Sequence, residues 1–267
     1  QAMARNARPA KPQLLVDVSE LVQRDARTGI QRVVRSILSE WLNNPPEEYE
    51  VRAVYANAER YGYCYANAFT QRFMNRTEVA QPDSSIDYAH GDVFLALDMQ
   101  PQVQVFQSPF YQHLRDCGVK VGFLVHDLLP INMPQYFPPG AATDHERWIR
   151  VAAKTDAILC VSRATANEVN NWLSKQEPQL KPHVDWFHNG ADIDSHAAHS
   201  TGLPPDAKEK LDALGTRPTF LMVGTLEPRK GHEQVLKAAE ELWAQRDFNL
   251  VVVGKQGWDV DALAKHL

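Results

Sequence analysis

The most informative segment of the sequence is Thr219-Phe220-Leu221-Met222-Val223-Gly224-Thr225-Leu226-Glu227-Pro228-Arg229-Lys230-Gly231. Its first five residues form a short apolar run, which is typical of a buried strand in a parallel sheet. A loop bounded by two glycines follows, and apolar residues then recur at helical intervals over residues 232–245. The stretch therefore predicts a strand, a loop and a helix, the repeating unit of sheets that are covered by helices.

The same alternation extends along most of the chain. A capping-box spacing at Thr28 and Gln31 predicts a helix start, a second one lies at Thr143 and Glu146, and Ser162 is placed to cap a further helix. The resulting fold class is α/β, with two doubly wound, Rossmann-like domains. Strands are predicted at 14–18, 49–55, 91–98, 120–125, 157–161, 183–187, 219–223 and 249–253, and helices at 30–42, 103–117, 143–154, 162–172, 206–214 and 232–245.

Composition shifts predict the domain boundaries. Residues 1–12 read as a lead-in or tag remnant and 13–190 as a complete N-terminal domain. Residues 191–205 are poor in large apolar residues and read as a linker, which leaves 206–267 for the second domain. Because only two strands are predicted there, we expect this domain to be truncated, with a bare sheet edge that a homo-oligomer or a swapped element would cover.

Composition also excludes several classes of protein. Hydrophobic residues make up 44% of the chain, so it can bury a core, and a formal charge of −5 gives no overall field for nucleic acid. No apolar stretch is long enough to cross a bilayer. The histidines His196 and His199 lie three apart, but without cysteines or a helical pattern we expect no metal site. The three cysteines, which fit a reducing cytoplasm better than a disulfide framework, are Cys64, Cys117 and Cys160.

The loops that follow the strands carry the candidate ligand contacts, because ligands bind beyond the carboxyl ends of parallel strands. In the loop 224–231, Arg229 and Lys230 stand before a helix start, where backbone N–H groups and fixed charge suit a diphosphate. The alternative is a solvated basic turn. Lys255, in the loop after the next strand, could serve the same anion, while Trp258 beside it reads as a core residue.

Two loops of the N-terminal domain are also candidates. Gly29 lies at a helix start and would let a ligand approach the backbone, although simple turn chemistry is the more common reason for a glycine at such a position. His126 and Asp127 follow the strand 120–125, where burial could tune either pKa. A hydrogen-bonded structural histidine remains the alternative there, and Asp127 could orient the imidazole or cap a turn.

Taken together, these motifs resemble those of the family 4 retaining glycosyltransferases, enzymes with two facing Rossmann-like domains known as the GT-B fold. Within that family they most resemble mannosyltransferase-like enzymes of bacterial surface polysaccharide (lipopolysaccharide) assembly. The motifs that carry the resemblance, in chain order, are Val16-Asp17-Val18-Ser19, Thr28-Gly29-Ile30-Gln31-Arg32-Val33-Val34-Arg35, His126-Asp127-Leu128-Leu129-Pro130, Cys160-Val161-Ser162, His188-Asn189-Gly190 and Val223–Gly231.

The resemblance implies transfer of a hexose, expected to be mannose, from a nucleotide-diphosphate sugar to a glycan or lipid-linked saccharide, without metal or another cofactor. It assigns His126 a place at the cleft near the transferred sugar, and we expect the catalytic residues to be His126 and Asp127. The donor-binding residues would be Gly29, Gly224, Thr225, Arg229, Lys230 and Lys255. The partners would be the nucleotide sugar and the glycan acceptor, with no nucleic acid. We expect a cytoplasmic location, with peripheral association at the inner membrane face left open.

Two departures from the family pattern bear on activity. Thr225 stands where many members have an arginine. The family's pair of glutamates seven residues apart would lie beyond Leu267, so we expect this chain by itself to turn over little or nothing. The alternatives are a sugar-nucleotide epimerase or hydrolase of the same fold, and a non-catalytic glycan-binding module.

Overall fold

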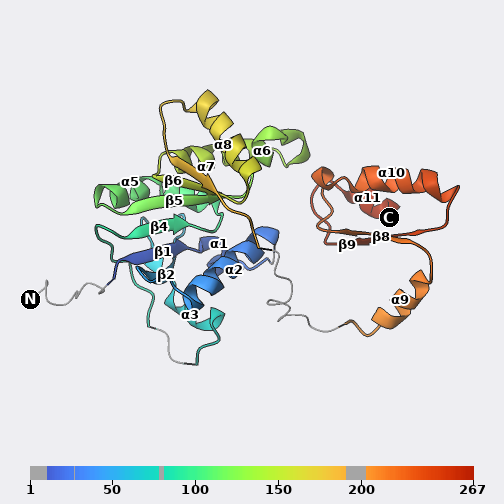
Figure 1. Ribbon diagram of the computed structural model, residues 1–267, viewed down its shortest axis with the longest axis horizontal. Coiled ribbons are helices and arrows are strands. Elements are labelled where there is room, and N and C mark those ends of the chain that lie inside the picture. Colours follow the sequence, from blue (N-terminus) through green and yellow to red (C-terminus); the bar gives the residue numbers. More distant parts are fainter. Residues whose placement is uncertain (1–10, 27, 78–80, 191–202) are drawn as a thin grey trace, which may run out of the picture. The chain divides into compact units, whose positions relative to one another are not determined.

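The computed structural model describes residues 11–26, 28–77, 81–190 and 203–267, and it divides into two compact units (Figure 1). The first unit comprises Gln1–Leu128 and Thr143–Asn189, and the second comprises Leu129–Ala142 and Gly190–Leu267. This division differs from the predicted one, which placed all of 13–190 in one domain. Most of the predicted linker, residues 191–202, lies outside the described residues, as do His196 and His199.

Among its described residues, the first unit forms a seven-stranded sheet with the order β3-β2-β1-β4-β5-β6-β7. All neighbouring pairs are parallel except β2 and β3, which pair antiparallel at one edge. The chain runs outward from β1 to β2 and later returns to the other side of β1 with β4, so the order reverses between β1 and β4. The strands are β1 (Gln13–Asp17), β2 (Glu50–Tyr55), β3 (Cys64–Tyr65), β4 (Val93–Ala96), β5 (Lys120–Val125), β6 (Ala157–Cys160) and β7 (His183–Trp186).

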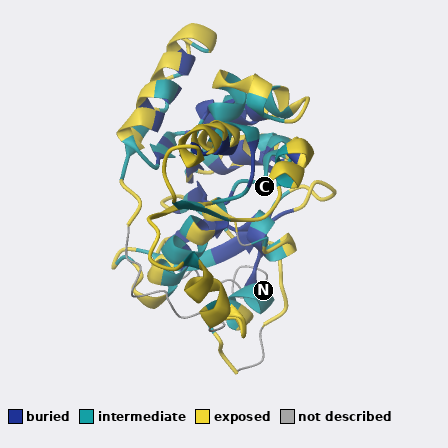
Figure 2. Ribbon diagram, turned by 90° about the vertical axis from the view of Figure 1, so that its right-hand side faces the viewer, coloured by how far each residue is buried: buried dark blue, intermediate teal, exposed yellow. Residues whose placement is uncertain are grey.

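Helices cover both faces of this sheet, and buried residues, dark blue in Figure 2, lie both on its central strands and on the helices. On one face, Val34 and Leu38 pack with the apolar residues of β1 and β4. On the other, the ring of Phe123 meets the rings of Tyr111 and Trp148, with centroids 5.2 and 6.3 Å apart. The helices are α1 (Ser19–Gln23), α2 (Gly29–Asn43), α3 (Asn67–Phe73), α4 (Pro101–Phe106), α5 (Ser108–Asp116), α7 (Ala141–Ala153) and α8 (Arg163–Gln176).

Two of the three predicted helix caps are confirmed. The Thr28 hydroxyl accepts from the Gln31 amide at 3.2 Å while the Gln31 side chain accepts from the Thr28 amide, and Ser162 accepts from the Thr165 amide at 3.1 Å. The box at Thr143 was wrongly predicted, because α7 already begins at Ala141. The single helix predicted over 103–117 is instead two helices, α4 and α5, and Pro109 lies in the first turn of the second.

The second unit has two parallel strands among its described residues, β8 (Thr219–Val223) and β9 (Asn249–Val253), with the predicted bounds. The α/β class is therefore confirmed, and the architecture is consistent with a Rossmann-like GT-B fold. No helix in the described part of the chain is long and apolar enough to cross a membrane. The remaining elements are α6 (Leu129–Asn132), η1 (Pro134–Tyr136), α9 (Ala207–Leu214), η3 (Pro228–Lys230), α10 (His232–Trp243) and α11 (Asp261–His266), the last of which was not predicted.

Candidate functional site

The loops that follow β8 and β9 lie side by side in the second unit. The amide of Gly224 donates to the Val253 carbonyl at 2.9 Å, and the amide of Leu226 donates to the Lys255 carbonyl at 2.8 Å. The amide of Gly257 in turn donates to the Leu226 carbonyl at 2.9 Å. The structure thus brings the backbone of Gly224 and Thr225 against that of Lys255, at the end of the sheet where ligands of such folds bind.

The basic residues of the first of these loops stand directly before α10. Arg229 and Lys230 close the 3₁₀ turn η3, and Gly231 follows with a φ of +73°, a backbone conformation that favours glycine. α10 then begins at His232, as predicted, so its unpaired amides and the positive end of its dipole lie next to Lys230. Lys230 is exposed, which leaves its ammonium available to an anion.

Arg229 is engaged in a way that the sequence did not predict. Its Nε lies 2.8 Å from Oε2 of Glu227, and its guanidinium carbon lies over the ring of Phe137, 5.7 Å from the centroid. The Glu227 side chain is buried, whereas a quarter of the Arg229 side chain is exposed. The simple reading of Arg229 as a free cation is therefore incomplete, because a buried carboxylate offsets its charge.

Phe137 belongs to the segment 129–142, which the chain enters after β5 and leaves into α7. Its ring stacks on that of Trp258 with centroids 5.8 Å apart, and the Trp258 indole N–H donates to the Tyr136 carbonyl at 3.0 Å. These contacts explain why 129–142 groups with the second unit, whereas the sequence pattern placed these residues within the domain 13–190. They also make half-buried Trp258 a packing residue, in keeping with its predicted role.

His126 follows β5 in the first unit and carries an unsatisfied nitrogen. Its Nε2 is buried and has no hydrogen-bond partner among the described residues. Burial lowers the pKa of this imidazole below its usual 6.5, and the nearby charge of Asp127 opposes that shift only in part. The ring is therefore expected to be neutral at pH 7. The backbone here is anchored, since the His126 carbonyl accepts from the Thr165 hydroxyl at 3.2 Å and the Asp127 carbonyl lies 3.1 Å from His145 Nε2.

Gly29 is the first residue of α2, and the space around it is open. A Cβ atom built there would have no heavy atom within 4 Å, and its φ lies outside the left-handed region. Neither packing nor backbone geometry in the described structure therefore requires a glycine at this position. Close approach of a ligand to this backbone stays a prediction.

Two buried carboxyl groups at the switch point escaped the sequence-based assignment. Asp17 ends β1 and accepts from the Ser19 amide at 2.9 Å and from the Tyr63 hydroxyl at 3.0 Å, and burial raises its pKa. Asp98 follows β4 and accepts from the Leu21 amide at 2.6 Å, and burial raises its pKa to about 7. Both carboxyl groups thus hold α1 at the point where the strand order reverses. The signal in the sequence was an aspartate after an apolar run.

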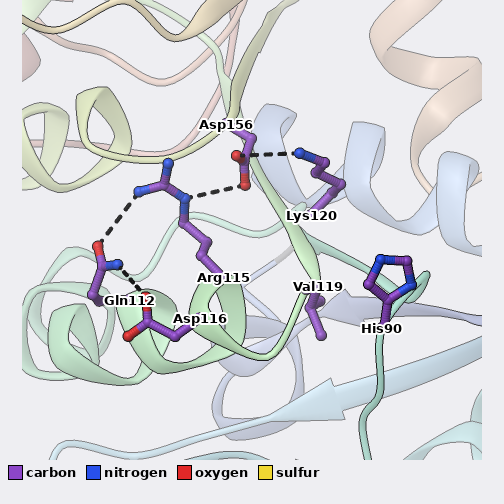
Figure 3. Close-up of a pocket in the computed structure, with 8 residues that line it drawn as sticks. His90, Gln112, Arg115, Asp116, Val119, Lys120 and Asp156 are labelled. Atoms are coloured by element: carbon purple, nitrogen blue, oxygen red, sulfur yellow. Dashed lines mark hydrogen bonds and ion pairs between the residues drawn. The ribbon is translucent and has the colours of Figure 1, made fainter.

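A further pocket of about 280 Å³ lies at the opposite, amino-terminal end of β5 (Figure 3). Charged side chains of this pocket form ion pairs with one another. Asp156 faces Arg115 at 3.2 Å and Lys120 at 3.8 Å, while the Gln112 amide donates to Asp116 at 2.8 Å. Because these groups are mutually paired and lie away from the carboxyl ends of the strands, we do not assign the pocket to the candidate site.

Comparisons with known proteins identify relatives of this chain. Residues 205–266 match the family model of "Glycosyl transferases group 1". Two relatives from Escherichia coli, both named "Serotype-specific mannosyltransferase WbdA", are 40% identical over 273 residues, and a third of the same name and organism is 38% identical. The alignments cover 100% of this chain but only 32–33% of each relative, so the chain spans about a third of their length. The predicted resemblance to glycosyltransferases is thereby confirmed.

Proposed function

We propose that this chain forms part of a retaining glycosyltransferase that moves a hexose from a nucleotide-diphosphate sugar to a glycan or lipid-linked saccharide. One observation carries the proposal. The paired loops after β8 and β9, with Lys230 before α10, lie within the residues that match the glycosyltransferase family model. Mannose is the proposed sugar because the relatives are named mannosyltransferases.

The donor diphosphate would lie at the start of α10. Three groups can donate to phosphate oxygens: the exposed Lys230 ammonium, the terminal nitrogens of Arg229 and the first amides of α10. Lys255 lies on the adjoining loop. When the bond from the sugar to the diphosphate breaks, negative charge develops on the leaving group. Fixed cations and a helix dipole stabilise such charge, so we propose that the transfer needs no metal.

His126 would position the transferred sugar in this reaction. Its buried and unpartnered Nε2 can exchange a hydrogen bond with a sugar hydroxyl. A neutral imidazole does so without opposing the positive charge that develops on the sugar ring during a retaining transfer. The role is that of a hydrogen-bonding group, because no covalent step on the ring is needed.

We place the reaction in the cytoplasm, with a lipid-linked acceptor at the inner membrane face. The three cysteines support a reducing compartment, since all are free and Cys117 is exposed. Fractionation of the protein at its natural length tests this placement. Recovery of the protein outside the cytoplasmic and inner-membrane fractions would contradict it.

The diphosphate site is tested by binding of inorganic pyrophosphate and of nucleoside diphosphates in a titration calorimeter. Lys230→Ala should weaken binding about ten- to a hundredfold, because a charge-assisted contact is lost. The matched control is Lys210→Ala, an exposed lysine of α9 that pairs with Asp206. Equal affinities of both variants and the unaltered chain would refute the site. Product analysis without acceptor separates the rivals, since an epimerase or hydrolase would convert the donor alone.

A further inference from the structure

Arg229 presents only part of its guanidinium to a ligand. Its Nε faces Glu227, and its guanidinium carbon lies over the ring of Phe137. Neither terminal nitrogen, Nη1 or Nη2, has a hydrogen-bond or ion-pair partner among the described residues. The contact with Glu227 is an ion pair without hydrogen-bond geometry, since Nε and Oε2 each lack a hydrogen-bond partner among the described residues. The edge that can chelate a phosphate through two parallel N–H groups stays open.

Phe137 is itself held in place. Its ring stacks on Trp258 with an interplanar angle of 29°, and the Trp258 N–H is tied to the carbonyl of the neighbouring Tyr136. Trp258 follows the loop after β9, and Arg229 lies in the loop after β8. The aromatic pair thus links the two loops of the candidate site through a segment from elsewhere in the sequence.

We propose that Phe137 is a positioning residue that orients Arg229 for the donor diphosphate. The inference rests on the diphosphate site proposed above and adds a residue to it. A long side chain that is already held in its binding rotamer loses less entropy when it binds. The contacts with Glu227 and Phe137 restrict the orientation of the Arg229 guanidinium before the ligand binds. The segment 129–142, which the chain forms between β5 and β6, would then complete the donor site of the second unit.

A double-mutant cycle tests the proposal with inorganic pyrophosphate as the probe. Phe137→Ala should weaken binding about tenfold, and Phe137→Tyr, which keeps the ring, should restore it. In an Arg229→Ala background, Phe137→Ala should have no further effect, because the residue that it orients is gone. A purely structural role would weaken binding by the same factor in both backgrounds, and that result would overturn the proposal.

Folding is checked for every variant by circular dichroism. If Phe137→Ala does not fold, Phe137→Leu takes its place, since it keeps apolar volume but removes the flat ring, and the same tenfold loss is expected. Tyr61→Ala, at an exposed aromatic of the first unit, is the control and should leave the affinity unchanged.

The two proposals fail in different ways. If both Lys230→Ala and Arg229→Ala leave pyrophosphate affinity unchanged, the diphosphate site itself is wrong. If both weaken binding but Phe137→Ala does not, the site stands and the positioning role of Phe137 is refuted. An effect of Lys230→Ala without one of Arg229→Ala likewise refutes the positioning role alone.

Discussion

The carbonyl oxygen of Gly224 occupies the space that a Cβ atom on Gly254 would need. The two glycines come from the loops after β8 and β9, and the same approach brings the Gly224 amide to 2.9 Å from the Val253 carbonyl. Only a residue without a side chain allows the two backbones to lie this close. The two loops of the candidate site therefore form one packed element.

Gly254→Ala should separate the loops that follow β8 and β9. The added Cβ meets backbone atoms, which cannot yield as a flexible side chain would, so the cost should be about 1–3 kcal/mol. We expect a lower thermal midpoint of the second unit and weaker pyrophosphate binding. Thermal denaturation followed by circular dichroism measures the first effect, and an unchanged midpoint would show that the loops are less tightly packed than described.

Gly29→Ala, in contrast, should raise the stability of the protein. Nothing lies within 4 Å of the added Cβ, and alanine favours a helix over glycine, so stability should rise by about 0.5–1 kcal/mol. If a ligand approaches this backbone, the rate of sugar transfer should nevertheless fall about tenfold or more. Urea denaturation and a transfer assay on the protein at its natural length measure the two effects. A stable variant with full activity would remove Gly29 from the site.

Local patterns in the sequence were sufficient for most of the fold. The helix α2 could be predicted because Thr28 and Gln31 form a capping box and the apolar residues behind them share one face. β8 and β9 were predicted with their observed bounds, since continuous apolar runs mark strands of a parallel sheet. The prediction that 219–223 is a buried strand was wrong for the described structure, because most of β8 is exposed. The break between α4 and α5 was missed, although Pro109 was the local signal for it.

The candidate site was predictable only in part, because its contacts span long separations in sequence. The loops, Lys230 and the start of α10 followed from the order of strand, loop and helix. The stack of Phe137 on Trp258 joins residues that are far apart in the sequence, and no local sequence pattern predicts it. Glu227 lay inside the quoted loop, but its pairing with Arg229 depends on side-chain geometry that spacing does not determine.

Asp98 should make the stability of the first unit depend on pH. Its pKa rises from 3.8 to about 7 on folding, because burial and the charges of Asp17 and Glu20 disfavour the carboxylate. The folded protein therefore keeps the proton over an interval in which the unfolded chain has released it. The stabilising contribution is fully present below pH 3.8 and is lost as the pH rises through about 7.

Asp98→Asn removes this titration while keeping the shape of the side chain. The stability of the variant relative to the unaltered protein should increase from about pH 4 to about pH 7 and then stay constant, whatever the constant cost of the new amide. Urea denaturation of both proteins across this range provides the comparison. A difference that does not change with pH would mean that Asp98 is ionised throughout.

His126→Ala should lower kcat of the protein at its natural length about a hundredfold while nucleotide affinity is kept. Burial lowers the pKa of the imidazole below its usual value of 6.5, so the ring stays neutral above that pH. Titration of His126 should therefore cause no change of kcat above neutral pH. Steady-state kinetics with donor and acceptor varied in turn provide the measurement. A loss of only a few-fold with normal folding would make His126 a structural residue.

The proposed reaction transfers a hexose from a nucleotide-diphosphate donor whose diphosphate is held before α10. Its most direct test supplies the protein at its natural length with nucleotide-diphosphate mannoses of different bases and a saccharide acceptor, and determines the product linkage by nuclear magnetic resonance. We predict an elongated saccharide that retains the anomeric configuration of the donor, and a large loss of transfer in Lys230→Ala. Isomerisation or hydrolysis of the donor without an elongated saccharide would contradict the proposed reaction. An unchanged rate of transfer in Lys230→Ala would contradict the proposed diphosphate site.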